Sequence, residues 1–334
     1  MKRFLLFLLP SFVCAAPAFA NVTITSPTRL SEVVSPFHLV ANSPNCSSET
    51  VRSIAYSIDN NSPTAFNGSS INTSVSSITG AHTVYVTAYG RRGATCNASV
   101  AIIVVPDPAT EVPSDASVFN NVQTLSGWQG VEDTAISGST ATGTTQLVSS
   151  PSLSGSARQF VMRFTDYGAE RYSVVFGSNT SVTNFLYDGW IYLARPSRDI
   201  ANIETDIDQV IANDQTVIYG FQCDGYSGTW DYTTNEAAPP ANSAGWLHSQ
   251  YGCNARSWST NTWHHVQIAF SRDQGSVTYQ AVWFDGVEED LNVSVPSAFT
   301  LDWAMVLLTN FQIDGYGASG SATAYLDKLT ISCW

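Results

Sequence analysis

The most regular segment of this sequence is Thr262-Trp263-His264-His265-Val266-Gln267-Ile268-Ala269-Phe270-Ser271-Arg272-Asp273. Successive side chains of a β-strand point to opposite faces of a sheet, so the even-numbered residues from His264 to Phe270 share one face. That face is mostly apolar and predicts a core strand of a β-sandwich, in which His264 is a buried, hydrogen-bonded histidine. His265 and Gln267 lie on the opposite face, where they either decorate a surface or form part of a ligand-binding groove.

A second strand and a turn follow this segment. The chain continues with Gly275-Ser276-Val277-Thr278-Tyr279 and then Trp283-Phe284-Asp285-Gly286-Val287, and its Asp-Gly pair is typical of a hairpin turn. A Trp-His-His-Val strand followed by a strand that ends in Asp-Gly resembles the laminin G-like and concanavalin A-like domains. The resemblance implies a jelly roll of two curved sheets, with a concave face used for glycans and with frequent calcium binding.

The chain beyond residue 117 shows the same alternation and almost no helical periodicity. Residues 118–334 are therefore predicted to form one large all-β sandwich, and the nine tryptophans all lie in this region. The strands expected there are 159–165, 172–176, 189–194, 203–212, 216–222, 263–272, 278–285, 305–313 and 322–332.

Residues 107–117 separate this region from a smaller one. They combine prolines with acidic residues and have no apolar periodicity, which is typical of an extended, fairly stiff linker. Residues 21–106 contain short alternating segments separated by turn residues, as expected for a second, small sandwich. The strands expected in it are 22–25, 37–41, 51–58, 71–76, 82–89 and 99–105.

Three motifs of the smaller region are Ser26-Pro27, the strand from Tyr56 to Asp59, and the strand from Gly80 to Ala88. They resemble bacterial immunoglobulin-like modules. The resemblance implies an immunoglobulin-like sandwich, a fold that serves as a spacer, an adhesin or a partner of a catalytic domain.

Residues 1–20 have the pattern of a cleavable signal peptide. Lys2 and Arg3 precede an apolar run, and Ala18-Phe19-Ala20 is the small-x-small pattern that signal peptidase cuts. The apolar run is too short to span a bilayer, and no later segment is long enough either. The sequence therefore predicts a secreted protein, extracellular, periplasmic or on the cell surface, without membrane insertion.

The charge balance excludes two classes of partner. The formal net charge is −13, and loss of Lys2 and Arg3 makes the protein more negative. Nucleic acid and anionic lipid surfaces repel such a protein, so neither is expected as a partner. The abundance of Ser, Thr, Asn, Gly and aromatic residues is typical of extracellular β-sandwiches.

Cysteine placement predicts two disulfides. Cys14 belongs to the leader, and the export route permits disulfides among the remaining cysteines. Pairing Cys46 with Cys96, both expected in loops, and Cys223 with Cys253 keeps each bond within one domain and leaves a single free thiol. That thiol is expected to be Cys333.

Three carboxylates alternate on the strand predicted at residues 203–212. Glu204, Asp206 and Asp208 fall on one face, where like charges repel unless water, a metal ion or a proton relieves them. The pattern resembles the Glu-x-Asp-x-Glu strand of laminarinase- and lichenase-type glycosidases. This resemblance implies that Glu204 is the nucleophile and Asp206 its helper, with Asp208 in the acid position.

Asp208 departs from that pattern. A retaining mechanism needs carboxyl groups about 5–5.5 Å apart, and an aspartate is one carbon shorter than the glutamate that the family has there. A solvated acidic strand or a set of calcium ligands is therefore the alternative interpretation of these carboxylates.

The segment between Cys223 and Cys253 is rich in aromatic residues and is expected to form a disulfide-closed loop. Its flat rings suit stacking on the faces of sugars. In the alternative interpretation, Trp230 and Trp246 pack this loop down as a small core of its own.

These features favour a secreted glycan-binding protein with a lectin-like concave sheet and an immunoglobulin-like spacer, whose partner is a polysaccharide or a cell-surface glycan. The candidate ligand-binding residues are Tyr226, Trp230, Trp246, His265 and Gln267. A glycan-cleaving hydrolase or lyase on the same sheet is one alternative, and a lyase would draw on His265, Gln267 and Tyr279. An adhesive or structural surface protein is another. The sequence requires no cofactor, leaves a structural calcium ion open, and carries no signal for the oligomeric state.

Overall fold

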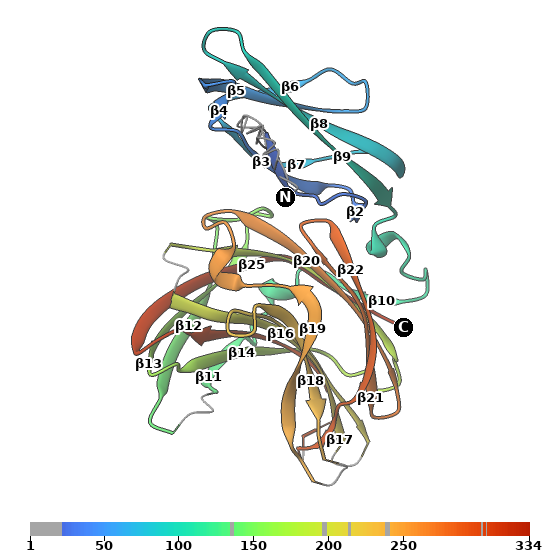
Figure 1. The fold of residues 1–334 in the computed structure, drawn as a ribbon. Coiled ribbons are helices and arrows are strands. Elements are labelled where there is room, and N and C mark those ends of the chain that lie inside the picture. Colours follow the sequence, from blue (N-terminus) through green and yellow to red (C-terminus); the bar gives the residue numbers. More distant parts are fainter. Residues whose placement is uncertain are drawn as a thin grey trace, which may run out of the picture. The chain divides into compact units, whose positions relative to one another are not determined.

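The computed structural model describes residues 22–334 apart from 134–136, 196–198, 213–214, 238–240, 302 and 305, and the side chain of residue 212. The predicted signal peptide and the start of the strand expected at 305–313 lie outside the described residues. The described chain is built of β-strands and short 3-10 turns and contains no α-helix, which confirms the predicted all-β fold class (Figure 1). No described helix is long and apolar enough to cross a membrane.

The chain divides into two compact units. The smaller one comprises the residues through Leu30 together with His38–Val75 and Ala81–Ile103. The larger one comprises Ser31–Phe37, Ser76–Gly80 and Val104–Trp334. Each unit is described by itself.

The smaller unit contains two sets of hydrogen-bonded strands. One set is β1 (Thr23–Ser26), β3 (Phe37–Asn42) and β7 (Ser70–Val75). The other is β4 (Asn45–Cys46), β5 (Glu49–Ile58), β6 (Thr64–Asn67), β8 (Gly80–Gly90) and β9 (Thr95–Val105). Val84, Val86 and Ala88 on one face of β8 are fully buried, as the alternation predicted.

The larger unit is a sandwich of two antiparallel sheets. The back sheet runs in the order β12 (Thr140–Val148), β13 (Ala157–Thr165), β25 (Ser319–Cys333), β15 (Asn184–Leu193), β20 (Trp263–Asp273), β21 (Ser276–Phe284) and β22 (Val287–Pro296). The front sheet runs in the order β11 (Gln129–Glu132), β14 (Ala169–Gly177), β24 (Leu307–Gly315), β16 (Ile200–Ala212), β17 (Gln215–Asp224), β18 (Thr229–Asn235) and β19 (Ala244–Gly252).

Three short strands extend these sheets. In the back sheet, β10 (Ser117–Phe119) pairs with β25, and β2 (Glu32–Val34) pairs with β22. In the front sheet, β23 (Ala298–Thr300) pairs with β17. The N-terminal segment Ser31–Phe37 thus contributes to the larger unit, which sequence analysis did not anticipate.

The core of the larger unit lies between its two sheets. It joins Ile203 and Ile207 of β16 and Tyr219 of β17 to Ile268 and Phe270 of β20. The even-numbered face of β20 is therefore a core face, as predicted. Aromatic rings fill much of this space, and burial of such large apolar side chains is the main stabilising contribution in a sandwich of this size.

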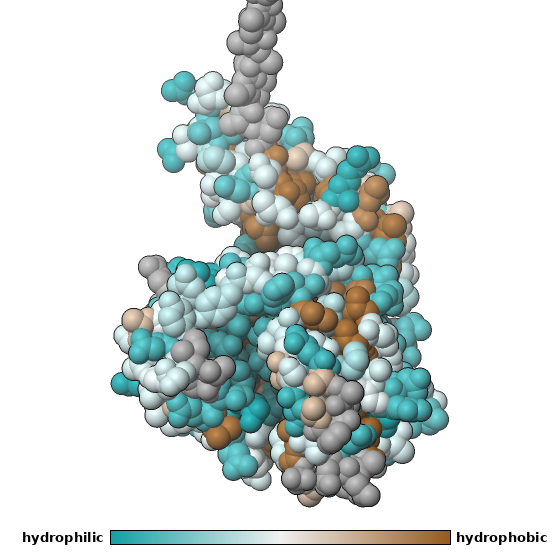
Figure 2. All heavy atoms as spheres, turned by 60° about the horizontal axis from the view of Figure 1, so that its bottom comes forward, coloured by the Kyte–Doolittle hydropathy of each residue, from teal (hydrophilic) through white to brown (hydrophobic). Residues whose placement is uncertain are grey.

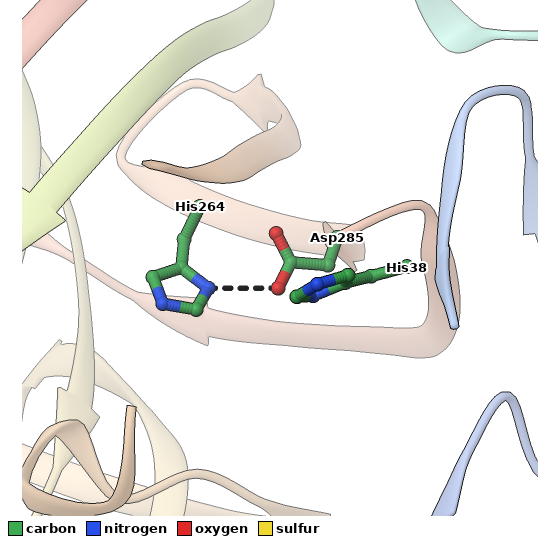
Figure 3. Close-up of side chains that lie close together, drawn as sticks. All are labelled: His38, His264 and Asp285. Atoms are coloured by element: carbon green, nitrogen blue, oxygen red, sulfur yellow. Dashed lines mark hydrogen bonds and ion pairs between the residues drawn. The ribbon is translucent and has the colours of Figure 1, made fainter. Parts of the chain in front are cut away.

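His264 is the buried, hydrogen-bonded histidine that the alternation predicted. Its Nδ1 lies 2.7 Å from Oδ2 of Asp285, and its Nε2 lies 3.0 Å from the carbonyl oxygen of Ser259 (Figure 3). Asp285 and Gly286 both have positive φ angles, 51° and 82°, as a two-residue hairpin turn between β21 and β22 requires. The same aspartate accepts a hydrogen bond from the backbone N–H of His265 through Oδ1.

Both predicted disulfides are present and Cys333 is a free, buried thiol. Two expectations around the cysteines are corrected. Cys46 and Cys96 lie in strands β4 and β9 instead of loops. The aromatic segment after Cys223 forms the hairpin β18–β19 instead of a loop, because the backbones of its two halves pair as antiparallel strands.

The predicted linker is more ordered than an extended segment. Pro108–Thr110 forms a 3-10 turn whose first residues are capped by Asp107, which accepts the backbone N–H of Ala109 at 2.9 Å. The same Oδ1 accepts a hydrogen bond of 2.8 Å from Nε2 of Gln267. This start of the larger unit is therefore attached to strand β20.

Replacing Cys223 and Cys253 by alanine is expected to lower the free energy of unfolding of the larger unit. The bond closes a loop with a sequence separation of 30, and such a cross-link removes entropy from the unfolded chain worth about 3–4 kcal/mol. Urea unfolding followed by tryptophan fluorescence measures this unit alone, because every tryptophan lies beyond residue 117.

The matched control is the double alanine variant at Cys46 and Cys96. It removes a disulfide from the smaller unit and is expected to leave the tryptophan transition unchanged. A similar shift in both variants would contradict the independence of the two units.

Candidate functional site

A cleft of about 900 Å³ lies on the face of the front sheet that points away from the core. It crosses the strands from Arg171 on β14 to Trp246 on β19. Figure 2 shows a hollowed surface on the larger unit that is mainly hydrophilic. The lining comprises Asp133, Tyr167, Ala169, Arg171, Asn202, Glu204, Asp206, Ile218, Gln222, Asp224, Tyr226, Thr233, Ala244, Trp246, Gln312 and Asp314.

The floor of the cleft is built on β16, the central strand. Because Ile203 and Ile207 face the core, the alternating residues Asn202, Glu204 and Asp206 face the cleft. The pairing register places further polar residues beside them on both neighbouring strands. Opposite Asn202 lie Asp224 and Asp314, opposite Glu204 lie Gln222 and Gln312, and opposite Asp206 lie Gly220 and Asn310.

Hydrogen bonds connect part of this floor. Nδ2 of Asn202 donates to Oε1 of Gln222 at 3.2 Å and to Oδ2 of Asp314 at 3.1 Å. Nε2 of Gln312 donates to Oδ1 of Asp314 at 3.0 Å. The amides therefore hold Asp314 from two sides.

Other polar atoms of the floor have no partner. Among the described residues, Oδ1 of Asp206, Oδ1 of Asp208 and Oε1 of Gln312 are buried without a hydrogen bond. All three are acceptors, and a buried polar group without a partner is costly. These three acceptor atoms therefore lack a donor among the described residues.

Burial changes the protonation of these carboxyls. Burial and the charge of Asp206 raise the pKa of Asp208 to about 8 and the pKa of Glu204 well above its ordinary value. Burial raises the pKa of Asp206 to about 6, although its hydrogen bond with Glu204 and the charge of Arg171 act in the opposite direction. Burial likewise raises the pKa of Asp314 to about 6. At neutral pH, Asp208 therefore keeps its proton, while Asp206 and Asp314 are mainly ionised.

Three tyrosines gather where the strands of the front sheet end. Tyr226 is 52% exposed, and its hydroxyl donates to the carbonyl oxygen of Gly315 at 3.0 Å. Its ring centroid lies 6.4 Å from that of Tyr167 and 5.8 Å from that of Tyr316. The guanidinium of Arg256 lies 3.8 Å from the centroid of Tyr316. Tyr167 and Tyr226 line the cleft, so this tyrosine group forms one part of its rim.

Sequence analysis missed Tyr167 and Tyr316, although a signal for both exists. Asp224-Gly225-Tyr226 and Asp314-Gly315-Tyr316 are the same tripeptide, and Asp166-Tyr167-Gly168 is a permutation of it. Each tripeptide begins within or directly beyond the end of a strand. Turns with an exposed aromatic residue at one edge of a sheet are a pattern that the sequence alone displays.

The structure brings four of the sequence-predicted site residues together. Glu204, Asp206, Tyr226 and Trp246 all line the cleft. Asp208 lies on the same face of β16 but is 2% exposed and lies outside the lining. Its Oδ2 accepts a hydrogen bond of 2.8 Å from Asn310.

Trp230 lies in the core of the larger unit. It is 3% exposed, and its ring stacks on Phe221 at a centroid distance of 5.2 Å and contacts Trp258 and Phe284. The packing interpretation of this tryptophan therefore fits the structure, whereas Trp246 lines the cleft.

His265 and Gln267 lie on the face of β20 that points away from the core, in the sheet opposite the cleft. Nε2 of His265 lies 2.7 Å from Oδ1 of Asp188, and Gln267 donates to Asp107 and Asp188. The hydroxyl of Tyr279, which is fully buried, donates to the carbonyl oxygen of Thr233. None of the three side chains lines the cleft.

One group of potential metal ligands borders the cleft. Ligand atoms of Asp224, Asp231 and His248 lie within 4.8 Å of one another. Nδ1 of His248 lies 2.8 Å from Oδ2 of Asp231, and Oδ1 of Asp231 accepts hydrogen bonds from the hydroxyl groups of Ser227 and Thr229. A set with a histidine differs from the all-oxygen ligands that calcium prefers, and its acceptors already have protein donors. Among the described residues, the carboxylates of β16 do not form such a group.

Comparisons with known proteins add little to this geometry. No protein-family model and no curated protein matches the sequence. A solved structure reported for the promiscuous specificity of carbohydrate-binding modules of the β-sandwich superfamily is 13% identical, with 92% of this chain and 96% of that chain covered and a TM-score of 0.32.

Two other solved structures are similarly distant. Arcelin-5, a lectin-like defence protein from Phaseolus vulgaris, is 12% identical over 66% of this chain and 99% of its own, with a TM-score of 0.34. The alginate lyase vAL-1 from Chlorella virus is 11% identical over 57% of this chain and 89% of its own, with a TM-score of 0.33. Similarities of this size carry no argument about function, which rests on the cleft.

The buried carboxyls predict how stability depends on pH. Burial raises the pKa of Asp208 from 3.8 to about 8 and that of Asp206 from 3.8 to about 6. The folded protein keeps these protons where the unfolded chain has released them. Their stabilising contribution is complete below about pH 4 and is lost as the pH rises through about 6 to 8. The free energy of unfolding of the larger unit is therefore expected to fall between pH 5 and pH 8.

Urea unfolding followed by tryptophan fluorescence at several pH values checks this expectation. Asp208→Asn removes the group with the higher pKa, keeps an acceptor for Asn310, and is expected to flatten the dependence. Asp273→Asn, at an exposed position at the end of β20, is the control and is expected to leave the slope unchanged. A slope that Asp208→Asn does not alter would contradict the assignment.

Proposed function

We propose that this chain is a secreted glycan-binding protein whose larger unit, a concanavalin A-like jelly roll, holds a polysaccharide across its front sheet. The observation that carries the proposal is the combination of aromatic rings at the rim with amide and carboxyl groups on the floor. Tyr167, Tyr226 and Trp246 contribute rings to the lining, while Asn202, Gln222, Gln312 and the carboxyls contribute hydrogen-bonding atoms. A sugar ring has the matching surfaces, an apolar C–H face and a periphery of hydroxyl groups.

The placement of the cleft supports a polymer as ligand. The lining runs across the sheet from β14 to the edge strand β19, and the tyrosine group lies at the strand ends. A volume of about 900 Å³ is at the upper end of the usual range for small-molecule pockets. A chain of several sugar units fits such a groove better than one monosaccharide does.

The glycan-cleaving alternative has less support. The acid position of the glucanase-like pattern is held by Asp208, which is buried outside the lining and bonded to Asn310. Glu204, the nucleophile in that pattern, has a pKa that burial raises well above its ordinary value, which favours the protonated form. A protonated carboxyl is no nucleophile, although it suits a general acid. Binding is therefore the function that the cleft supports best.

The remaining parts of the chain fit an exported protein. The leader-like residues 1–20 and the two disulfides are typical of an oxidising compartment. The smaller unit, with its resemblance to immunoglobulin-like modules, would serve as a spacer.

Tyr226→Ala and Trp246→Ala are each expected to weaken binding of the glycan about fivefold, since stacking on one ring contributes about 1 kcal/mol. Affinity electrophoresis against a panel of immobilised polysaccharides identifies the ligand and measures the change. Tyr85→Ala removes a comparably exposed ring from the smaller unit and is expected to have no effect. Retention by no glycan, or retention unchanged in both cleft variants, would contradict the proposal.

A reducing-sugar assay on the same panel separates binding from cleavage. The wild type is expected to release no reducing ends from a polymer that it retains. If a polymer is cut and Glu204→Gln abolishes the cutting while retention persists, the glycosidase interpretation is the correct one.

A further inference from the structure

We infer that the glycan held by this cleft is cationic and carries free amino groups, as glucosamine polymers do. The inference rests on the glycan-binding function proposed above and assigns a substrate class to the same site. Two independent observations carry it: the charge of the lining, and the buried carboxylate oxygen on its floor that has no donor.

The first observation is the charge of the lining. Five carboxyl residues line the cleft, Asp133, Glu204, Asp206, Asp224 and Asp314, whereas Arg171 is the one basic residue among the described lining residues. Arg171 is engaged at one end of the cleft, where its Nη1 lies 3.0 Å from Oδ2 of Asp133. The charge of Arg171 still lowers the pKa of Asp206 and Asp208, but the carboxyl residues of the lining outnumber this one cation. An anionic polysaccharide such as a uronate polymer would add like charges there.

The second observation is the unsatisfied acceptor. Asp206 lines the cleft and is 5% exposed, yet its Oδ1 has no hydrogen-bond partner among the described residues. Oε1 of Gln312, one strand away, is also without a partner. A hydroxyl group can donate one hydrogen bond to such an acceptor, whereas an ammonium group donates up to three and brings the missing positive charge. The floor is thus complementary to ammonium groups more than to hydroxyl groups.

A metal ion matches these unsatisfied acceptors less well than ammonium groups do. Calcium gathers six to eight oxygen ligands around one point. Among the described residues, Glu204, Asp206 and Asp208 do not bring three ligand atoms within 4.8 Å of one another. They are spread along β16 at every second residue, with amide side chains opposite Glu204 on both neighbouring strands and opposite Asp206 on one of them. A row of separated acceptors suits charges that repeat along a polymer. The rim rings remain available for the sugar faces.

Isothermal titration calorimetry with three hexasaccharides tests the inference. The glucosamine hexamer and the N-acetylglucosamine hexamer share linkage and length and differ in the ammonium group, and cellohexaose carries a hydroxyl group at that position. At pH 6 and low salt, the glucosamine hexamer is expected to bind about tenfold more tightly than the other two, because hydrogen bonds to charged groups are the stronger ones. The advantage is expected to shrink as salt is added.

Two variants connect this preference with the floor. Asp206→Asn keeps the size of the side chain and is expected to abolish the preference, so that the three hexamers bind with similar affinity. Asp314→Asn, also in the lining, is expected to reduce the preference. It replaces Asp206→Asn as the test variant if Asp206→Asn fails to fold. Asp273→Asn lies outside the cleft and is expected to leave the preference intact.

The outcomes separate this inference from the function on which it rests. If a neutral hexamer binds as tightly as the glucosamine hexamer, and Trp246→Ala weakens this binding, the inference of a cationic glycan is wrong. The proposed glycan-binding function then still stands. Binding of none of the three, together with no retention on any polysaccharide, overturns both. Calcium chloride is titrated as well. If calcium binds the wild type but not Asp206→Asn, and displaces the glucosamine hexamer, the floor is a metal site and the inference is also wrong.

Discussion

Strand β16 separates two environments, and both the core and the cleft depend on its alternation. Ile203 and Ile207 face the other sheet, while Glu204 and Asp206 face the cleft. A shift of one residue in the pairing would turn carboxylates into the apolar core and isoleucines into the cleft. Antiparallel pairing with β17 on one side and β24 on the other, over most of the strand, holds the register. The core therefore fixes the position of the floor.

The strands beside β16 relieve its buried carboxyls only in part. Asn310 donates to Asp208, and the charge of Arg171 lowers the pKa of both Asp206 and Asp208, but burial outweighs these effects. Replacing such a row by apolar residues would often stabilise a sheet. Polar groups that are buried, incompletely satisfied and gathered in a cleft are characteristic of a site at which the fold gives up stability for binding.

The sequence was sufficient to predict strands whose alternating pattern lies within one segment. It was insufficient where the orientation of a side chain depends on how two strands pair. Period-two alternation predicted β16 and β20 and the buried role of His264, because each pattern is contained within one segment. Trp230 and Trp246 show the limit, since both belong to one hairpin of aromatic residues. Trp230 lies opposite Cys223, which faces the core, whereas Trp246 lies opposite Thr233, which lines the cleft. Only the register of the hairpin distinguishes the two rings, and composition carries no information on register.

In the proposed complex with a glycan, the rim and the floor contribute to recognition in different ways. Ring faces at Tyr226 and Trp246 accept the C–H face of almost any sugar, so they add affinity with little selectivity. The floor discriminates, because a ligand that fails to satisfy a buried carboxylate leaves that group's desolvation uncompensated. A cation beside Asp206 supplies the missing donor and moves the pKa of that carboxyl back toward its ordinary value. Binding then reverses the destabilisation that the ionised floor imposes at neutral pH, so that ligand and fold stabilise each other through the same oxygen atoms.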